Sequence, residues 1–335
     1  MKKLHTIRNR IIHAIQQRQP GDLPEAYRLF NGFYEGLPGL VLDRYGPALV
    51  IFEHSHPGEH KKIIKEISRW VLENIPGLSA VLLKQRQHSD DRMKNGILIS
   101  GDSLPVSTNE FGVNYVLDLQ MNQDAGFYLD TRRLRRWLKE NMSGKRVLNT
   151  FAYTGSLGVA AGVGGAREVL QTDINEKFLT IAEESWRLNA LPEGRCTLLA
   201  GDFFRVMGRL RHQDRLFDCV ILDPPFFSAT EAGRVDLQAG STRLINKVRP
   251  LIAHQGWLVV INNAIYLSGE AFMAEVTTLC QSKYLQMEKT IPVPPDITGY
   301  PETIVDVPPV DPAPFNHPTK IVTFKVFRKD ERQKG

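Results

Sequence analysis

The feature that most restricts the fold is a regular alternation of short apolar runs and helix-length amphipathic segments, which begins near residue 131. Five runs have the length and composition of buried strands: RVLNTFA (146–152), EVLQTD (168–173), CTLLAGD (196–202), FDCVILD (217–223) and GWLVVIN (256–262). Helices are predicted around them, at 131–141, 156–163, 175–188, 203–210, 238–253 and 269–281. Strands separated by helices form parallel sheets with right-handed crossovers and helices on both faces. The sequence therefore predicts an α/β domain over residues 107–335.

The first third of the chain predicts a smaller α+β domain over residues 1–106. Its elements are read from helical periodicity and from strand-length apolar runs. They are a helix at 4–18, a hairpin at 39–55, a helix at 58–75 and strands at 79–86 and 95–102. A further hairpin over 109–119 leads into the larger domain.

The end of the chain is unusual in its proline content. Nine of the 20 prolines lie between Pro292 and Pro318, and proline excludes a persistent helix or central strand there. Such a long irregular connection is either disordered or functional. We favour a packed loop over 292–318 that faces the substrate, followed by a closing strand at 319–327.

Composition excludes several classes of protein. No apolar run has the 18 or more residues of a membrane-spanning helix. The first residues are charged and lack the apolar core of a signal peptide, so we expect a cytoplasmic protein without a membrane partner. The cysteines Cys196, Cys219 and Cys280 have neither disulfide nor metal-ligand spacing, so we expect no metal site.

The net charge of +5 comes with basic residues that gather in the first 136 positions. The groups are Lys2, Lys3, Arg8 and Arg10; Lys61, Lys62 and Lys65; KQRQH (84–88) and RMK (92–94); and Arg132, Arg133, Arg135 and Arg136. Such groups suit the backbone of a nucleic acid, although solvated helix faces have the same composition.

The segment RVLNTFAYTGSLGVAAGVGGA (146–166) predicts a strand, a tight turn and a helix of small residues. Gly155 and Gly158 permit close approach of a ligand or a strand, and the helix would point its amides at a bound group. Two acids end the next strands: Asp173, suited to ribose hydroxyls, and Asp202, suited to an adenine amino group or simply to capping a helix. The dinucleotide fingerprint with three glycines is absent, which disfavours hydride transfer.

The segment VILDPPFFS (220–228) ends the fourth strand of the alternation. Proline has no amide hydrogen, so Asp223, Pro224 and Pro225 present carbonyl and carboxylate acceptors that suit the polar edge of a base. Phe226 or Phe227 can stack on that base. A rigid strand-to-loop turn with a buried phenylalanine is the structural alternative.

These residues resemble the class I S-adenosylmethionine-dependent methyltransferases. Within that class the chain is similar to the ribosomal RNA large-subunit methyltransferases that act on cytosine C5 or guanine N7. Five motifs carry the resemblance in order: NGFYEGLPGLVLDRYG (31–46), DAGFYLDTRRLRR (124–136), FAYTGS (151–156), DPPFF (223–227) and the pair Asn262-Asn263. The resemblance implies a Rossmann-like domain with a mostly parallel seven-stranded sheet, preceded by the smaller domain. It implies an enzyme with S-adenosyl-L-methionine as cofactor and RNA as partner.

The resemblance also implies which residues form the sites. Phe151, Ala152, Tyr153, Thr154 and Gly155 would wrap the methionine part, and Asp173 and Asp202 would bind the nucleoside. Asp130 and Arg132 would border the amino-acid end of the cofactor, although Asp130 can equally cap the following helix. The expected cofactor set is completed by Asn149, Ile174, Phe203 and Asp223, and the expected catalytic set is Asp223, Pro224, Pro225, Phe226, Asn262 and Asn263.

Cysteine usage distinguishes the two chemical branches. Methylation of cytosine C5 uses a thiolate that adds to the ring, and in that branch the cysteine follows the fifth strand. Here Asn262 and Asn263 stand at that place, as in the guanine-N7 branch, and Ala264 follows where a basic residue is expected. Capping of the next turn is the alternative role of the two asparagines.

We therefore expect transfer of a methyl group to a base nitrogen of RNA, with guanine N7 as one candidate and 23S ribosomal RNA as the substrate. Methylation of another RNA atom, a non-RNA substrate and a non-catalytic RNA-binding role stay open as alternatives. A homodimer is also left open.

Overall fold

The structure is a computed structural model that describes residues 2–18, 23–237 and 240–329. The chain forms two compact units. The first unit comprises Met1–Asp130 and Pro294–Pro308, and the second comprises Thr131–Val293 and Pro309–Gly335. This division differs from the predicted boundary after residue 106, because 107–130 and a returning segment both pack with the first unit. Among the described residues, no helix is long and apolar enough to cross a membrane.

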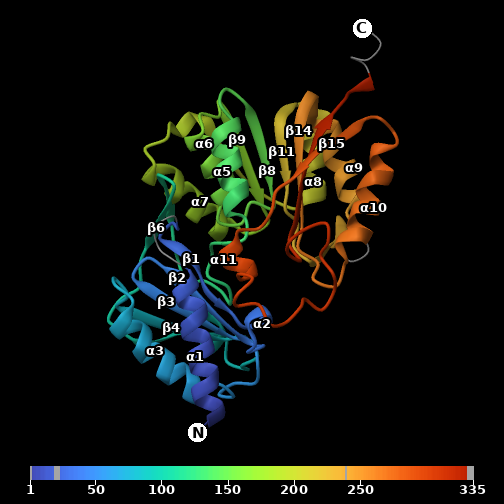
Figure 1. Ribbon diagram of the computed structural model, residues 1–335. Coiled ribbons are helices and arrows are strands. Elements are labelled where there is room, and N and C mark those ends of the chain that lie inside the picture. Colours follow the sequence, from blue (N-terminus) through green and yellow to red (C-terminus); the bar gives the residue numbers. More distant parts are fainter. Residues whose placement is uncertain (1, 19–22, 238–239, 330–335) are drawn as a thin grey trace. The chain divides into compact units, whose positions relative to one another are not determined.

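The first unit is a five-stranded sheet with helices and a separate two-stranded ribbon (Figure 1). The sheet order is β1-β2-β3-β4-β5, in which only β3 and β4 are parallel because α3 connects them. The elements are α1 (Lys2–Gln17), β1 (Ala26–Asn31), α2 (Gly32–Glu35), β2 (Leu40–Tyr45), β3 (Ala48–Glu53), α3 (Lys61–Asn74), β4 (Ala80–Gln85), α4 (Asp91–Asn95), β5 (Ile97–Ser100), β6 (Ser107–Glu110) and β7 (Val113–Val116). Helices α1 and α3 cover the sheet through an apolar cluster that includes Ile11, Ile64 and Ile51. The sequence analysis missed β1, whose AYRLFN lacks a regular alternation.

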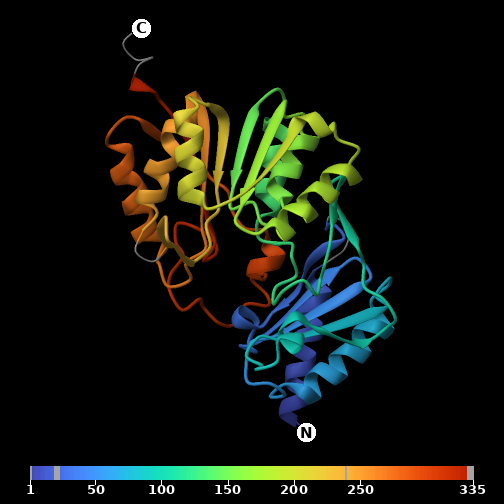
Figure 2. The ribbon, with the colours of Figure 1, turned by 180° about the vertical axis from the view of Figure 1, so that it is seen from behind.

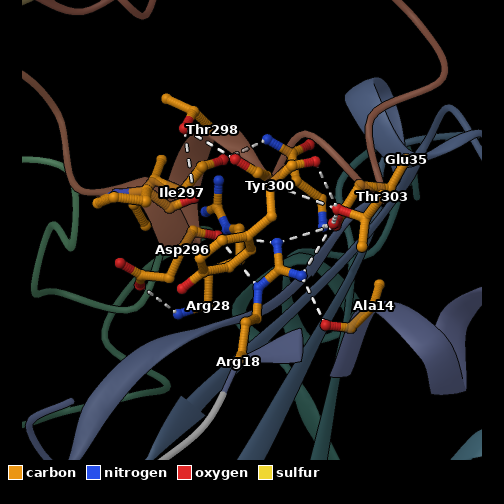
Figure 3. A network of polar contacts seen from close by, with 12 residues as sticks. Ala14, Arg18, Arg28, Glu35, Asp296, Ile297, Thr298, Tyr300 and Thr303 are labelled. Atoms are coloured by element: carbon orange, nitrogen blue, oxygen red, sulfur yellow. Dashed lines mark hydrogen bonds and ion pairs between the residues drawn. The ribbon is translucent and has the colours of Figure 1, made fainter. Parts of the chain in front are cut away.

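A buried ion pair joins α1 to α2 in the first unit (Figure 3). Arg18 donates from Nη1 and Nη2 to the two carboxylate oxygens of Glu35, each at 2.9 Å, and both side chains are fully buried. The returning segment closes this network: Arg18 also donates to the Asp296 carbonyl, and Thr303 donates to Glu35 Oε1 at 2.5 Å. Part of the proline-rich tail is therefore packed structure rather than a disordered loop.

Two further contacts fix the returning segment, which contains the short helix α11 (Pro295–Thr298). The Arg28 amide donates to Asp296 Oδ2 at 3.0 Å, and Asn31 Nδ2 donates to the Ile297 carbonyl at 2.9 Å. Packing of 294–308 agrees with the expected packed loop, and its predicted contact with the substrate stays a prediction.

The second unit contains the predicted large sheet, in the order β10-β9-β8-β11-β14-β16-β15 (Figure 2). The first five of these are parallel, and β16 is antiparallel to both of its neighbours. The elements are α5 (Arg132–Asn141), β8 (Arg146–Thr150), α6 (Ser156–Val163), β9 (Glu168–Asp173), α7 (Glu176–Leu188), β10 (Cys196–Ala200), α8 (Phe203–His212), β11 (Phe217–Leu222), β12 (Phe227–Thr230), β13 (Gly233–Asp236), α9 (Thr242–Val248), β14 (Ile252–Asn262), α10 (Gly269–Cys280), β15 (Leu285–Thr290) and β16 (Lys320–Val326), with short 3-10 turns at Glu193–Arg195 and Arg249–Leu251. The predicted α/β fold with a mostly parallel seven-stranded sheet is confirmed.

One predicted helix is shorter than expected. Within the range 238–253, α9 covers Thr242–Val248, a 3-10 turn follows at Arg249–Leu251 and β14 begins at Ile252, while residues 238 and 239 lie outside the described residues. Pro250 lies in that turn, where a helix cannot continue through it. The sequence analysis also missed β15, five of whose six side chains are exposed, so that no apolar alternation marks it.

The buried pair of the first unit gives a test of its packing. We expect Glu35→Ala to destabilise the first unit by about 3–5 kcal/mol, because it leaves the Arg18 charge buried without its partner. Hydrogen–deuterium exchange of the full chain should show faster exchange of the α1 and β1 amides. The exposed pair Lys94–Asp91 provides the control: Asp91→Ala should leave those amides unchanged, and equal protection in both variants would contradict the prediction.

Candidate cofactor loop and strand-end site

The order of the sheet places two sequence motifs side by side in the second unit. β8 pairs with β11, so that Thr150 lies opposite Leu222, and Thr150 Oγ1 donates to the Ile221 carbonyl at 2.7 Å. The chain leaves β8 toward β9 on one side and leaves β11 toward β14 on the other. In an open α/β sheet, such a switch point is where a crevice for ligands forms at the carboxyl ends of the strands.

The loop after β8 has an unusual backbone. Phe151, Tyr153 and Gly155 have φ angles of +54°, +51° and +77°, and each left-handed non-glycine residue costs of the order of 1 kcal/mol or more. Hydrogen bonds hold this conformation: the Ala152 amide donates to the Thr172 carbonyl, and the Gly155 amide donates to the Ala152 carbonyl. Backbone strain that the surrounding structure maintains in this way is typical of ligand sites.

The two glycines of this loop serve internal packing. A Cβ on Gly155 would lie 2.3 Å from Ala182 Cβ on α7, and a Cβ on Gly158 would lie 2.2 Å from Gln171 Oε1 on β9. Close approach of the neighbouring strand and helix is therefore present at both glycines, and approach of a ligand stays a prediction. Asn149 belongs to the same packing, because it is buried and its Nδ2 donates to Gln171 Oε1 at 3.1 Å.

Asp173 ties the loop to the end of β9. Its Oδ2 accepts the Tyr153 amide at 2.9 Å, and its Oδ1 accepts the Asn175 amide at 3.0 Å. The carboxylate is half-buried, and each oxygen has a second lone-pair site for a ligand hydroxyl. Ile174, the next residue, is 65% exposed. Tyr153 packs edge-on against Phe178 at 4.5 Å.

Asp202 caps α8, which is one of the two roles predicted for it from the sequence; the other is binding of an adenine amino group. Its Oδ1 accepts the Arg205 amide at 3.0 Å at the start of α8, and its Oδ2 accepts the Thr230 hydroxyl at 2.5 Å. Phe203 is buried and stacks on Phe151 with 4.6 Å between ring centroids. The structure thus brings Phe203 to the cofactor loop, and contact of Asp202 with adenine stays a prediction.

The segment at 124–136 belongs partly to the first unit and partly to the second. Asp130 is the last residue of the first unit, whereas Arg132 is buried at the start of α5 in the second. Thr131, rather than Asp130, occupies the N-cap position of α5. Its hydroxyl accepts a hydrogen bond from the buried Arg135 at 2.8 Å.

The predicted basic groups are only partly available for a polyanion. Arg132 and Arg135 are buried, and so is Lys84, which donates to the carbonyls of Asn95 and Asn122 at 2.6 and 2.7 Å. Burial lowers the pKa of Lys84 to about 8. The lysines of α3, by contrast, are exposed: Lys61, Lys62 and Lys65.

The residues of the motif after β11, at 223–226, differ in their exposure to solvent. Asp223 is half-buried and Pro224 is buried, while Pro225 is exposed and Phe226 is 42% exposed. The exposed phenylalanine excludes the alternative in which this ring serves only to fill the core. The residues after the motif form the β12–β13 hairpin, which the sequence analysis missed. Its sequence FSATEAGRVD does not alternate in hydrophobicity.

The two asparagines after β14 differ. Asn262 is fully buried, donates to Ser241 Oγ at 3.2 Å and accepts the Ala264 amide at 3.0 Å, which is the turn-capping alternative. Asn263 is half-buried, and its Oδ1 has no hydrogen-bond partner among the residues that the structure describes. The Oδ1 atom of Asn263 is itself buried, and contact of either asparagine with a substrate stays a prediction.

A lysine from another strand lies at the turn that contains Ala264. Lys320 pairs with Asn262 across β14 and β16, and its Nζ donates to the carbonyls of Ala264 and Pro318 at 2.9 and 2.7 Å. Burial lowers the pKa of Lys320 to about 8. Sequence spacing gave no signal for this residue, because it reaches the turn through strand pairing.

No cysteine of the chain is placed as a nucleophile. Cys219 is fully buried within β11, and burial raises the pKa of its thiol. Burial also raises the pKa of Cys196 to about 11 and that of Cys280 above its ordinary value. At each of the three cysteines, burial disfavours the thiolate, which is the reactive form. No cluster of three or more metal-ligating side chains occurs among the described residues.

A strained, hydrogen-bonded loop at the switch point of a sheet in this strand order defines an α/β unit of the kind that binds a nucleotide cofactor. A family model for S-adenosylmethionine-dependent methyltransferases matches residues 52–305. The chain belongs to this family.

Comparison with curated proteins finds relatives named ribosomal RNA large subunit methyltransferase I. The protein from Erwinia tasmaniensis is 27% identical over 288 residues, which are 83% of this chain and 72% of that protein. The protein from Aeromonas salmonicida is 33% identical over 211 residues, which are 62% of this chain and 52% of that protein. For the latter, the match spans about half of the relative's length.

Comparison with solved structures supports the fold. A Streptococcus mutans structure described as an S-adenosylmethionine-dependent methyltransferase has a TM-score of 0.79 at 22% identity, covering 96% of this chain and 81% of that one. A methyltransferase from Agrobacterium tumefaciens has a TM-score of 0.63 at 17% identity, covering 91% of both chains.

The pKa of Lys320 gives a test of the turn after β14. The folded pKa of about 8 lies below the ordinary 10.5, so between these values the unfolded chain binds a proton that the folded chain does not. Stability contributed by Lys320 therefore increases with pH across that window. We expect the free energy of unfolding of the wild type, relative to Lys320→Met, to rise between pH 8 and pH 10.5. Denaturant titrations of the two proteins would measure it, and a constant difference would contradict it.

Proposed function

We propose that this protein transfers a methyl group from S-adenosylmethionine to a base of ribosomal RNA of the large subunit. The observation that carries the proposal is the pairing of β8 with β11, which sets the strained loop at 151–155 beside Asp223-Pro224-Pro225-Phe226. The names of the curated relatives support ribosomal RNA as the substrate class. The exposed lysines of α3 suit its phosphate backbone.

The residues of the second unit fit the cofactor. S-adenosylmethionine supplies an electrophilic methyl group on a sulfonium sulfur. Asp173 has lone pairs for the ribose hydroxyls, and Phe151 with Phe203 offers an apolar wall at the loop. Arg132 would pair with the carboxylate of the amino-acid end, bidentately where its guanidinium permits.

Asp223 and the Pro224 carbonyl would accept hydrogen bonds from the amino edge of the target base, and Phe226 would stack on its face. The base nitrogen then donates its lone pair to the methyl carbon while the carbon–sulfur bond breaks. Position, rather than acid–base chemistry, accounts for most of the rate of such a step. A base in paired RNA must leave its helix to reach this rim.

We further propose a nitrogen, rather than carbon C5 of cytosine, as the methylated atom. The C5 route needs a thiolate, and burial raises the pKa of all three thiols. Guanine N7 carries a lone pair and no proton, so that it needs neither a thiolate nor a base. Asn263 would orient such a base through hydrogen bonds of its side-chain amide.

Transfer to RNA is tested with tritiated S-adenosylmethionine and total RNA that lacks the modification. We expect label in large-subunit RNA with the wild type, and a loss of at least about 100-fold in kcat with Asp223→Ala because the target base loses an acceptor that fixes it. The exposed Asp214→Ala serves as the control and should retain transfer. Label confined to protein or small molecules would refute the RNA substrate.

The cofactor assignment is tested by calorimetry with S-adenosylmethionine. We expect Asp173→Ala to raise Kd at least about tenfold, because charge-assisted hydrogen bonds to the ribose are lost. Asp173→Asn keeps one acceptor oxygen, so its Kd should lie between that of the wild type and that of Asp173→Ala. An unchanged Kd for Asp173→Ala would place the nucleoside elsewhere.

A further inference from the structure

The β12–β13 hairpin that follows the strand-end motif has two chemically different faces. Its register pairs Phe227 with Asp236 and Ala229 with Arg234 on one face, and Ser228 with Val235 and Thr230 with Gly233 on the other. Facing residues of a hairpin project to the same side. The two faces can therefore be assigned separate roles.

The face with Val235 and Thr230 docks the hairpin on the second unit. Val235 is 2% exposed and belongs to the main apolar core. The Thr230 hydroxyl donates to Asp202 Oδ2, and a Cβ on Gly233 would lie 2.4 Å from Phe204 Cε2, so the Phe204 ring packs closely on the hairpin backbone. This face holds the hairpin against the start of α8.

The opposite face is exposed. Phe227 is 52% exposed, and the Arg234 guanidinium lies over its ring at 5.0 Å from the centroid. Phe227 and Arg234 are diagonal neighbours across the strand pair, a position from which long and aromatic side chains reach each other. Ala229, which lies opposite Arg234, is small and leaves the ring exposed. The Arg234 guanidinium also donates to Asp236 Oδ2 at 2.6 Å on the same face. The apolar core gains nothing from a phenylalanine at this position.

The hairpin is also fixed relative to the cofactor loop. Asp202 joins Thr230 to the N-terminus of α8, and Phe203 on the first turn of α8 stacks on Phe151. Phe203 contacts Phe204 edge-on at 5.1 Å, and Phe204 lies against Gly233. A chain of contacts thus runs from the strained loop to the hairpin within one unit.

We propose that the outward face of the β12–β13 hairpin binds an unpaired RNA nucleotide next to the one that is methylated, with its base on Phe227 and its phosphate at Arg234. This inference rests on the proposed function. An exposed aromatic ring beside a guanidinium is the combination that binds single-stranded nucleic acid, because rings stack on bases and arginine pairs with phosphate. The bases of duplex RNA are already stacked and offer no face to such a ring.

The test compares binding of a short unstructured RNA and of its duplex to the full chain by fluorescence anisotropy. We expect Phe227→Ala to weaken binding of the single strand about tenfold, which is about 1.4 kcal/mol, and to leave duplex binding unchanged. Phe227→Trp should restore binding. Arg234→Ala should reduce the dependence of affinity on salt, because one phosphate contact is lost. The controls are Met287→Ala on β15, where the methionine is 40% exposed, and Arg187→Ala on α7.

Unchanged single-strand affinity in Phe227→Ala would overturn the inference, as would equal losses for single strand and duplex. Unchanged single-strand affinity is also the result expected if a protein partner, rather than RNA, covers this face. Failure of the proposed function is distinguishable, because the wild type itself would then not label RNA with tritiated methyl groups. If the wild type labels RNA and Phe227→Ala binds and labels it equally well, only the hairpin inference falls.

Discussion

The pairing of β8 with β11 is the contact on which the organisation of the second unit depends. Hydrogen bonding between these strands, with the Thr150 hydroxyl donating to the Ile221 carbonyl, joins two halves of the chain that run to opposite edges of the sheet. Because both strands end at the same edge, the loop at 151–155 and the motif at 223–226 become neighbours. The cofactor and the acceptor base of the proposed reaction must meet at this point.

The N-terminus of α8 is the second centre of the unit. Asp202 caps the helix and also accepts the Thr230 hydroxyl, while Phe203 packs on Phe151. One turn of helix therefore connects the cofactor loop to the hairpin after Pro225. These two hydrogen bonds give Asp202 a structural role at this strand end, whatever it binds in addition.

Buried charge holds the irregular parts of both units. In the first unit, Glu35 accepts from Arg18 and Thr303 and so fixes the segment 294–308 (Figure 3). In the second, Lys320 donates to two carbonyls at the turn after β14. Prolines and turns leave carbonyls without ladder partners, and a buried ammonium or guanidinium satisfies several of them at once.

The sequence by itself determined the α/β class, nearly all strands of the large sheet and the tight turn at 151–155, because apolar periodicity and glycine spacing are local properties. It also marked Asp173 and Asp223, which end strands. It did not determine the hairpin at 227–236, the roles of Asn262 and Lys320, or the burial of Arg132, Arg135 and Lys84. Only the tertiary structure decided these. The hairpin depends on Asp202, the turn after β14 depends on β16, and Lys84 depends on the Asn122 carbonyl, all of them distant in the chain. Local pattern selects the element, and long-range packing selects which side chains remain available to a ligand.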